Sequence, residues 1–108
     1  MEDQSFEGPE KRKFFRVKYI PSAGPTIRIG NHDFEVVDIS ERGLQFLNDK
    51  NVKFAEWIRG TLTFSDREAL VIEGRIIWRG GAKIGLKLVT PIPYVRILKE
   101  QRYQVDVS

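Results

Sequence analysis

Two short polar segments hold side chains that could bind an anion or the edge of a nucleobase. In the first segment, Arg12 and Arg16 place two guanidinium groups four residues apart. In the second segment, Asp38 is followed by Ser40 and then by Gly43. A guanidinium group offers paired N–H donors to a phosphate or to the O6/N7 edge of guanine, a geometry that lysine lacks. The pattern predicts recognition of a ligand rather than catalysis.

Each segment also has an interpretation that needs no ligand. On an extended strand, Arg12 and Arg16 would lie about 13 Å apart at their alpha carbons, and basic side chains often protect an exposed sheet edge. Asp38 and Ser40 favour turns because their side chains bond nearby backbone groups. Gly43 permits a positive φ or a close backbone approach. The order and spacing of the two segments, in a β-rich chain, favour the binding site.

Other kinds of site find little support in the composition. The chain has no cysteine and a single histidine, His32, so we expect no disulfide, no metal site and no cofactor. A triad of His32, Asp38 and Ser40 is not expected, because no nucleophile-elbow pattern surrounds the serine. We therefore predict a surface histidine and a protein that is not an enzyme.

The distribution of charge points to the first segment. The 108 residues include 18 basic and 15 acidic side chains, a net charge of +3. Residues 2–10 are acidic, whereas residues 11–18 contain five basic side chains and no acidic one. An anion is expected at the basic run. A net charge this small does not indicate nucleic acid as the partner. An oligonucleotide-binding β-barrel with a basic and aromatic patch is therefore kept only as the alternative function.

Alternating apolar residues predict short strands. The clearest strand covers residues 69–79, where Ile72, Ile76 and Trp78 share one parity, which favours the core for the tryptophan. Gly80-Gly81 predicts a hairpin turn after it. Residues 49–60 fit a strand or a helical turn equally, and the role of Trp57 stays open. Further strands are expected near residues 15–19, 27–29, 34–39, 44–46, 62–64 and 84–88.

These elements predict one all-β domain. We expect a small antiparallel β-barrel of about six strands with a short C-terminal helix from about residue 92. Phe34, Val36 and Asp38 are expected on one face of their strand. Residues 1–11 are expected to form a flexible leader, and residues 12–108 the domain. No apolar run reaches the roughly 18 residues that span a bilayer, and no signal segment is visible, so we expect a cytoplasmic protein without a membrane span.

The two polar segments together resemble the signature of the PilZ domain family, whose members are bacterial receptors for the second messenger cyclic di-GMP. That signature is Arg-x-x-x-Arg, then Asp/Asn-x-Ser-x-x-Gly some twenty to thirty residues later. Gly74 and Trp78 in one strand, with Gly85 in the next, are similar to a later family feature. The resemblance extends from about residue 11 to residue 89.

The resemblance implies a ligand site and its chemistry. Arg12 and Arg16 would contact phosphate and guanine, and in the family these arginines fold over the ligand from a mobile segment. Lys11, the residue before the first arginine, would influence whether one nucleotide or a stacked pair binds. The implied ligand-binding residues are Lys11, Arg12, Arg16, Asp38, Ser40 and Gly43.

The second segment would complete that site. Asp38 would accept hydrogen bonds from the N1–H and N2–H₂ edge of guanine, Ser40 would bond the ligand, and Gly43 would keep the turn open. The expected function is a cyclic di-GMP receptor that orders its arginine segment and signals through an effector protein that the sequence does not identify. A barrel that keeps the fold but binds no nucleotide remains a third interpretation.

Overall fold

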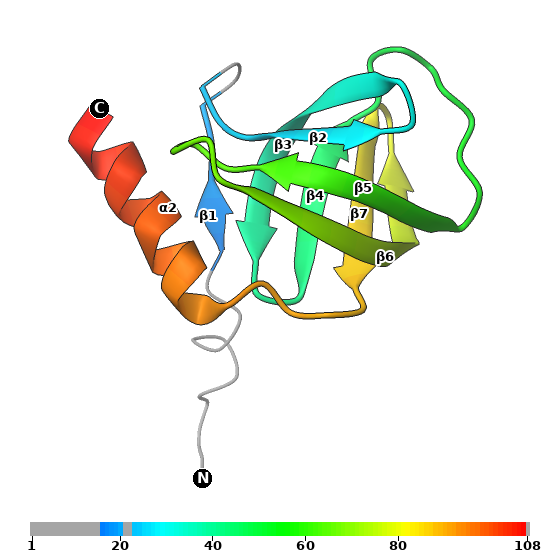
Figure 1. Ribbon diagram of the computed structural model, residues 1–108. Coiled ribbons are helices and arrows are strands. Elements are labelled where there is room, and N and C mark those ends of the chain that lie inside the picture. Colours follow the sequence, from blue (N-terminus) through cyan, green and yellow to red (C-terminus); the bar gives the residue numbers. More distant parts are fainter. Residues whose placement is uncertain (1–15, 21–22, 108) are drawn as a thin grey trace, which may run out of the picture.

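The structure is a computed structural model that describes residues 16–20 and 23–107. Its elements follow one another as seven strands and then a helix (Figure 1). They are β1 (Val17–Lys18), β2 (Thr26–Ile29), β3 (His32–Ser40), β4 (Gly43–Leu47), β5 (Trp57–Thr63), β6 (Ala69–Gly80), β7 (Lys83–Leu88) and α2 (Tyr94–Val107).

The strands form a closed antiparallel barrel. Their order in the sheet is β1-β3-β2-β5-β6-β7-β4, and a further pairing of β3 with β4 joins the two sides. Closure leaves few exposed strand edges. Within the described residues, six strands have four or more residues, and the two-residue β1 pairs only with β3. The predicted all-β barrel of about six strands with a C-terminal helix is therefore confirmed.

The core lies inside this barrel. Phe34 and Phe46 are almost fully buried, and each packs against Phe54 with ring centroids 5.5 and 5.7 Å away. Full burial of one such side chain stabilises a fold by about 1.5–3 kcal/mol. Ile92 and Ile97 bring the start of the C-terminal segment into the same core. The barrel is thus a well-packed support for the residues on its surface.

Trp78 does not lie in the core, which corrects the prediction from parity. Ile76 pairs with Leu86, but Trp78 pairs with Gly85, so β6 contains a bulge at this point. A bulge inserts one residue and moves the following side chains to the opposite face. As a result the Trp78 side chain is 47% exposed. Trp57, left open by the sequence, is also exposed.

A second register shift occurs in β3, between Val36 and Asp38. Phe34 and Val36 are buried on the core side of β3, yet Ile39 is also fully buried, although strict alternation from Phe34 would place it on the opposite face. The shift turns the end of β3 so that Asp38, Ile39 and Ser40 are all buried in succession. It thereby changes the orientation of the two polar residues that the sequence singled out.

Three connections differ from the sequence-based expectation. Residues 48–56 form an irregular loop, and β5 begins only at Trp57. Gly80 ends β6, so the hairpin turn falls on Gly81 and Ala82, with a positive φ of 60° at Gly81. The helix begins at Tyr94, two residues later than predicted, and the carbonyl of Pro93 accepts the first backbone N–H donors of the helix.

Helix α2 lies beside β1 at one end of the barrel (Figure 1). In the part of the chain that the structure describes, no helix is both long enough and apolar enough to cross a membrane.

Candidate functional site

Strand β1 brings Arg16 to the second polar segment. Val17 pairs with Ile39 and Lys18 with Asp38, so the residue just before β1 lies next to the end of β3. That residue is Arg16, whose Nη1 donates to Oδ1 of Asp38 at 2.5 Å. The contact joins positions 22 residues apart in the sequence. Lys11 and Arg12 lie outside the described residues.

The tight turn from β3 to β4 holds the other two motif residues. Ser40 pairs with Gly43 across the two turn residues, and the Ser40 hydroxyl donates to the Gly43 carbonyl at 3.4 Å. A Cβ atom added to Gly43 would lie 3.8 Å from both the Nη2 of Arg16 and the Oγ of Ser40. The four described motif residues therefore meet at one place on the barrel.

Glycine is required at position 43 by a close contact. The sequence suggested either a positive φ or a close backbone approach at this glycine. Its φ is not in the positive range, so the close approach is the reason. An added Cβ would lie only 2.9 Å from the carbonyl oxygen of Leu86 on β7. Gly43 thus lets β4 and β7 pair closely just beneath the turn.

The site residues differ in their access to solvent. Asp38 is 5% exposed and Ser40 is 2% exposed, whereas the side chain of Arg16 is 38% exposed. A carboxylate that is buried this far requires a charged or hydrogen-bonding partner. Arg16 fills that role and is also the member of the group that an incoming ligand would meet first.

A small hollow adjoins Arg16. Its volume is about 100 Å³, and its lining comes from β4, β6, β7 and the arginine: Arg16, Leu44, Gln45, Ile77, Trp78, Gly85 and Leu86. The Trp78 ring lies over Gly85, where an added Cβ would be 3.4 Å from the indole. Ligand pockets usually measure about 300–1,000 Å³, so this hollow alone is smaller than a typical ligand site.

Sequence reasoning missed the position of Trp78 in this site. The bulge that exposes the indole has no clear signature in a run of alternating apolar residues. The available signal was Gly85 in the opposite strand, because a glycine there leaves room for a large ring on the surface.

A larger hollow lies elsewhere on the described part of the chain. It measures about 570 Å³ and is lined by Asn48, Asn51, Val52, Lys53, Phe54, Arg79, Gly81, Ala82 and Ile84. None of the four described motif residues is in its lining. The smaller hollow is the better candidate because it is bordered by Arg16, which contacts Asp38.

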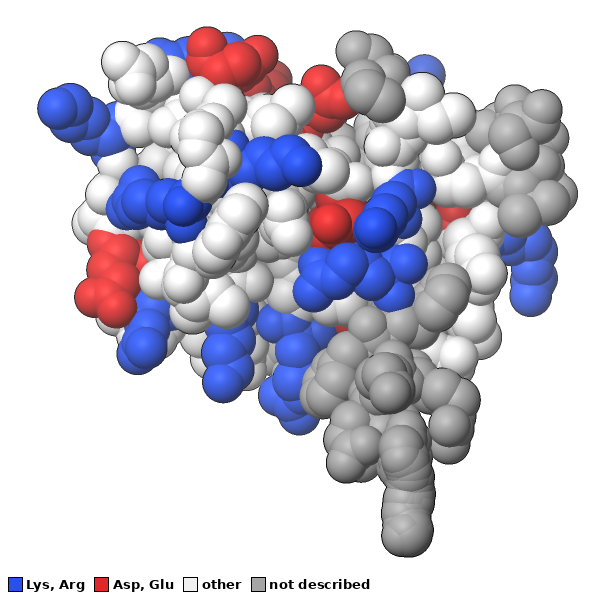
Figure 2. Space-filling model, turned by 180° about the vertical axis from the view of Figure 1, so that it is seen from behind, with Lys and Arg blue, Asp and Glu red and all other residues white. Residues whose placement is uncertain are grey.

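One face of the molecule carries mostly basic side chains. Figure 2 shows Lys and Arg side chains spread over the side of the molecule opposite to the view of Figure 1, with few acidic side chains among them. Such a surface attracts anions over distances of about a Debye length, roughly 8–10 Å at physiological salt.

His32 and Ser40 lie far apart, whereas a catalytic triad would require them to be close together. His32 is exposed at the first position of β3, and Ser40 is at the last position of the same nine-residue strand. The predicted surface histidine is confirmed. Among residues 16–20 and 23–107, no group of three or more His, Cys, Asp or Glu side chains could hold a metal ion.

Comparison with known proteins gives a family match and one structural relative. The PilZ domain family matches residues 10–103. The crystal structure of an uncharacterized Legionella protein superposes with a TM-score of 0.59 at 16% sequence identity, covering 87% of this chain and 94% of that one. This likeness concerns the fold. No curated protein matches the chain.

Proposed function

Because the chain belongs to the PilZ domain family, we propose that it is a receptor for cyclic di-GMP that works without catalysis. The observation that carries the proposal is the meeting of Arg16, Asp38, Ser40 and Gly43 at one place, from segments that are far apart in the sequence. The proposed binding residues are these four together with Lys11 and Arg12.

The chemistry of the group suits a guanine nucleotide. Arg16 has donors on three nitrogens, and only its Nη1 is engaged by Asp38 among the described contacts. Its remaining donors can bond a phosphate or the O6/N7 edge of guanine. The carboxylate of Asp38 has a second oxygen that can accept from the N1–H and N2–H₂ edge of a guanine. Ser40 adds a hydroxyl that both donates and accepts.

Trp78 adds a surface for stacking. Its exposed indole borders the same hollow as Arg16, and stacking of a base on an aromatic ring contributes about 1–3 kcal/mol. The flat platform over Gly85 and the guanidinium fork nearby would bind the face and the edge of a base at the same time.

The arginine segment would complete the site by folding over the ligand. The hollow of about 100 Å³ leaves most of a dinucleotide uncovered, and Arg12, four residues before Arg16, is the nearest further guanidinium group in the sequence. Micromolar binding requires about −8 kcal/mol, and ordering a segment costs roughly 2–5 kcal/mol. Bidentate arginine contacts of about 1–3 kcal/mol each, with stacking, can supply that total.

Signalling would then pass to a partner protein. A segment ordered by the nucleotide presents a surface that differs between the bound and the free receptor, and a partner that reads this surface shifts the nucleotide affinity in return. The proposed location is the cytoplasm, because a chain without cysteine has no need of an oxidising compartment.

A thermal-shift screen tests the proposal. Ligands that bind only the native state raise the unfolding temperature, so we expect a rise with cyclic di-GMP and none with cyclic di-AMP, GTP or a short oligonucleotide. Arg12→Ala and Arg16→Ala should each abolish the rise.

Arg28→Ala is the matched control, because Arg28 of β2 also pairs with an aspartate, Asp33 of β3. Asp33 is near the start of β3, whereas the site is at the end of that strand. The Arg28→Ala variant should keep the full rise. A normal rise in both site variants, or a rise with the oligonucleotide that falls steeply with salt, would contradict the proposal and favour the alternative function.

A further inference from the structure

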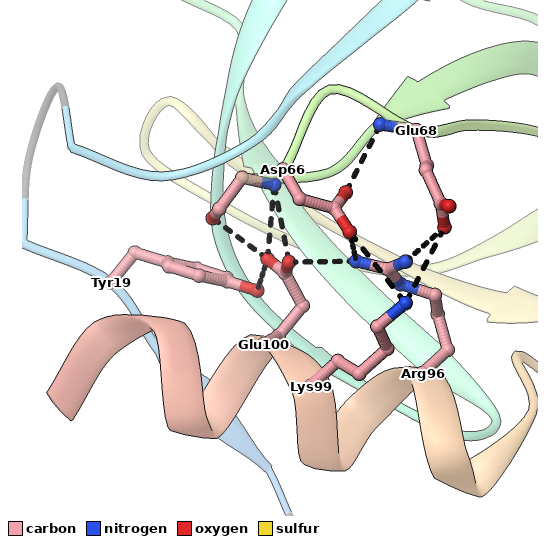
Figure 3. Close-up of polar contacts among 7 residues, drawn as sticks. Tyr19, Asp66, Glu68, Arg96, Lys99 and Glu100 are labelled. Atoms are coloured by element: carbon pink, nitrogen blue, oxygen red, sulfur yellow. Dashed lines mark hydrogen bonds and ion pairs between the residues drawn. The ribbon is translucent and has the colours of Figure 1, made fainter. Parts of the chain in front are cut away.

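A buried carboxylate connects helix α2 to strand β1. Glu100 is fully buried, and its Oε1 accepts a hydrogen bond from the Tyr19 hydroxyl at 2.7 Å (Figure 3). The same carboxylate accepts from the Oγ of Ser65 at 2.9 Å and from its backbone N–H at 3.1 Å. A single helix residue thus holds two separate parts of the barrel.

Arg96, one turn earlier on α2, secures the helix to the turn between β5 and β6. Its Nη2 lies 2.9 Å from Asp66 and 3.2 Å from Glu100, and its Nη1 pairs with Glu68. The guanidinium group also stacks over the ring of Phe64 at 4.2 Å. These contacts compensate the burial of the Glu100 charge, which would otherwise be strongly unfavourable.

Tyr19 belongs to the same short segment as the site arginine. Its backbone N–H donates to the carbonyl of Val37 at 2.9 Å, which continues the pairing of β1 with β3. Only the two residues of β1 separate it from Arg16, and a two-residue strand supplies few hydrogen bonds of its own. The position of Arg16 against Asp38 therefore depends on what holds Tyr19.

The Tyr19 hydroxyl also responds to charges on α2 and on β3. Burial raises the pKa of the Tyr19 hydroxyl above its usual range, and the hydrogen bond and charge of Glu100 act in the same direction. The charge of Asp38 adds to this rise of the pKa. The hydroxyl stays protonated, so it remains a donor to Glu100 at every physiological pH.

We propose that Tyr19 and Glu100 are positioning residues for the nucleotide site: Glu100 of α2 holds β1 through Tyr19, and β1 in turn sets Arg16 against Asp38. The inference rests on the proposed function and adds a regulated element to it. Because coupling between two sites is reciprocal, a nucleotide that closes on Arg16 stabilises the docking of α2. Any partner that pulls α2 away weakens nucleotide binding.

The test compares two variants that each remove one hydrogen bond from the same carboxylate. Tyr19→Phe removes the bond from β1, and Ser65→Ala removes the side-chain bond from the turn after β5. Calorimetric titration with cyclic di-GMP should show binding that is about fivefold weaker or more for Tyr19→Phe, the lower end of typical coupling. Ser65→Ala should bind as the wild type does.

Hydrogen exchange supplies a second measurement, which does not depend on the affinity of either variant for cyclic di-GMP. In the wild type, saturating cyclic di-GMP should slow exchange of the α2 amides as well as those of β3 and β4. In Tyr19→Phe with the nucleotide at saturation, the protection of β3 and β4 should persist and that of α2 should be lost.

The outcomes separate this inference from the proposed function. If the wild type does not bind cyclic di-GMP, both are overturned. If the wild type binds and both variants bind as tightly as the wild type, only the positioning role is overturned. The same holds if both variants bind equally weakly, because a general loss of stability would weaken binding in both. Nucleotide protection of α2 that is the same in the wild type and in Tyr19→Phe also overturns it.

Discussion

The ion pair between Arg16 and Asp38 should contribute measurably to the stability of the free protein. The perturbation is a double-mutant cycle of Arg16→Ala and Asp38→Ala, read in the free energy of unfolding without ligand. The cycle isolates the interaction between the two side chains from their other contacts.

The expected magnitude follows from burial. Exposed ion pairs contribute about 0–1 kcal/mol, and breaking a fully buried pair costs about 3–5 kcal/mol. Here the Asp38 side chain is 7% exposed and the Arg16 side chain is 38% exposed, with 2.5 Å between the paired atoms. The pair lies between the two cases, so we expect an interaction energy of about 1–2 kcal/mol.

The chain contains a matched pair for comparison. Arg28 and Asp33 approach to 3.0 Å in two contacts, but their side chains are 55% and 59% exposed. Their cycle should give no more than about 0.5 kcal/mol. Urea unfolding followed by circular dichroism measures both cycles. An Arg16–Asp38 energy equal to or below that of the exposed pair would refute the argument that β1 holds the arginine against a buried carboxylate.

Three further predictions follow from individual contacts. Trp78→Ala should weaken cyclic di-GMP binding by about 1–3 kcal/mol in calorimetry while changing the unfolding temperature little, because the indole is exposed; unchanged affinity would exclude stacking. Gly43→Ala should lower the free energy of unfolding by about 1–3 kcal/mol in urea, because its Cβ would lie 2.9 Å from the carbonyl oxygen of Leu86; a wild-type midpoint would contradict the close approach. Above pH 10, the stability of the wild type should fall as pH rises, since unfolded Tyr19 loses its proton while folded Tyr19 keeps it. Thermal unfolding in alkaline buffers should show a shallower fall for Tyr19→Phe, and equal slopes would contradict the raised pKa.

The sequence predicted the fold well because the signals that specify it are local. Alternating apolar residues and turn-forming glycines identified the long strand β6 and its hairpin with β7, and a short C-terminal helix was expected from about residue 92. Such patterns report which side chains can face a common core. The two polar motifs carried the family resemblance, which the match over residues 10–103 confirms.

The details that a local pattern could not supply all involve bulges and contacts between distant residues. A single extra residue in β6 exposes Trp78, and a similar shift in β3 buries Ile39. Parity is lost at such a point, and nothing in the run of apolar residues marks it. The buried network of Tyr19, Arg96 and Glu100 was equally invisible, because it depends on how α2 docks on β1.

Calorimetric titration of the wild type and of Arg16→Ala with cyclic di-GMP, with Arg28→Ala measured beside them, tests the central claim most directly. That claim is that guanidinium groups bind the nucleotide next to the turn that follows Asp38. The account predicts saturable binding by the wild type and by Arg28→Ala, and at least about tenfold weaker binding by Arg16→Ala, the equivalent of about 1.4 kcal/mol. Equal affinity in all three proteins, or no binding by the wild type, would contradict it.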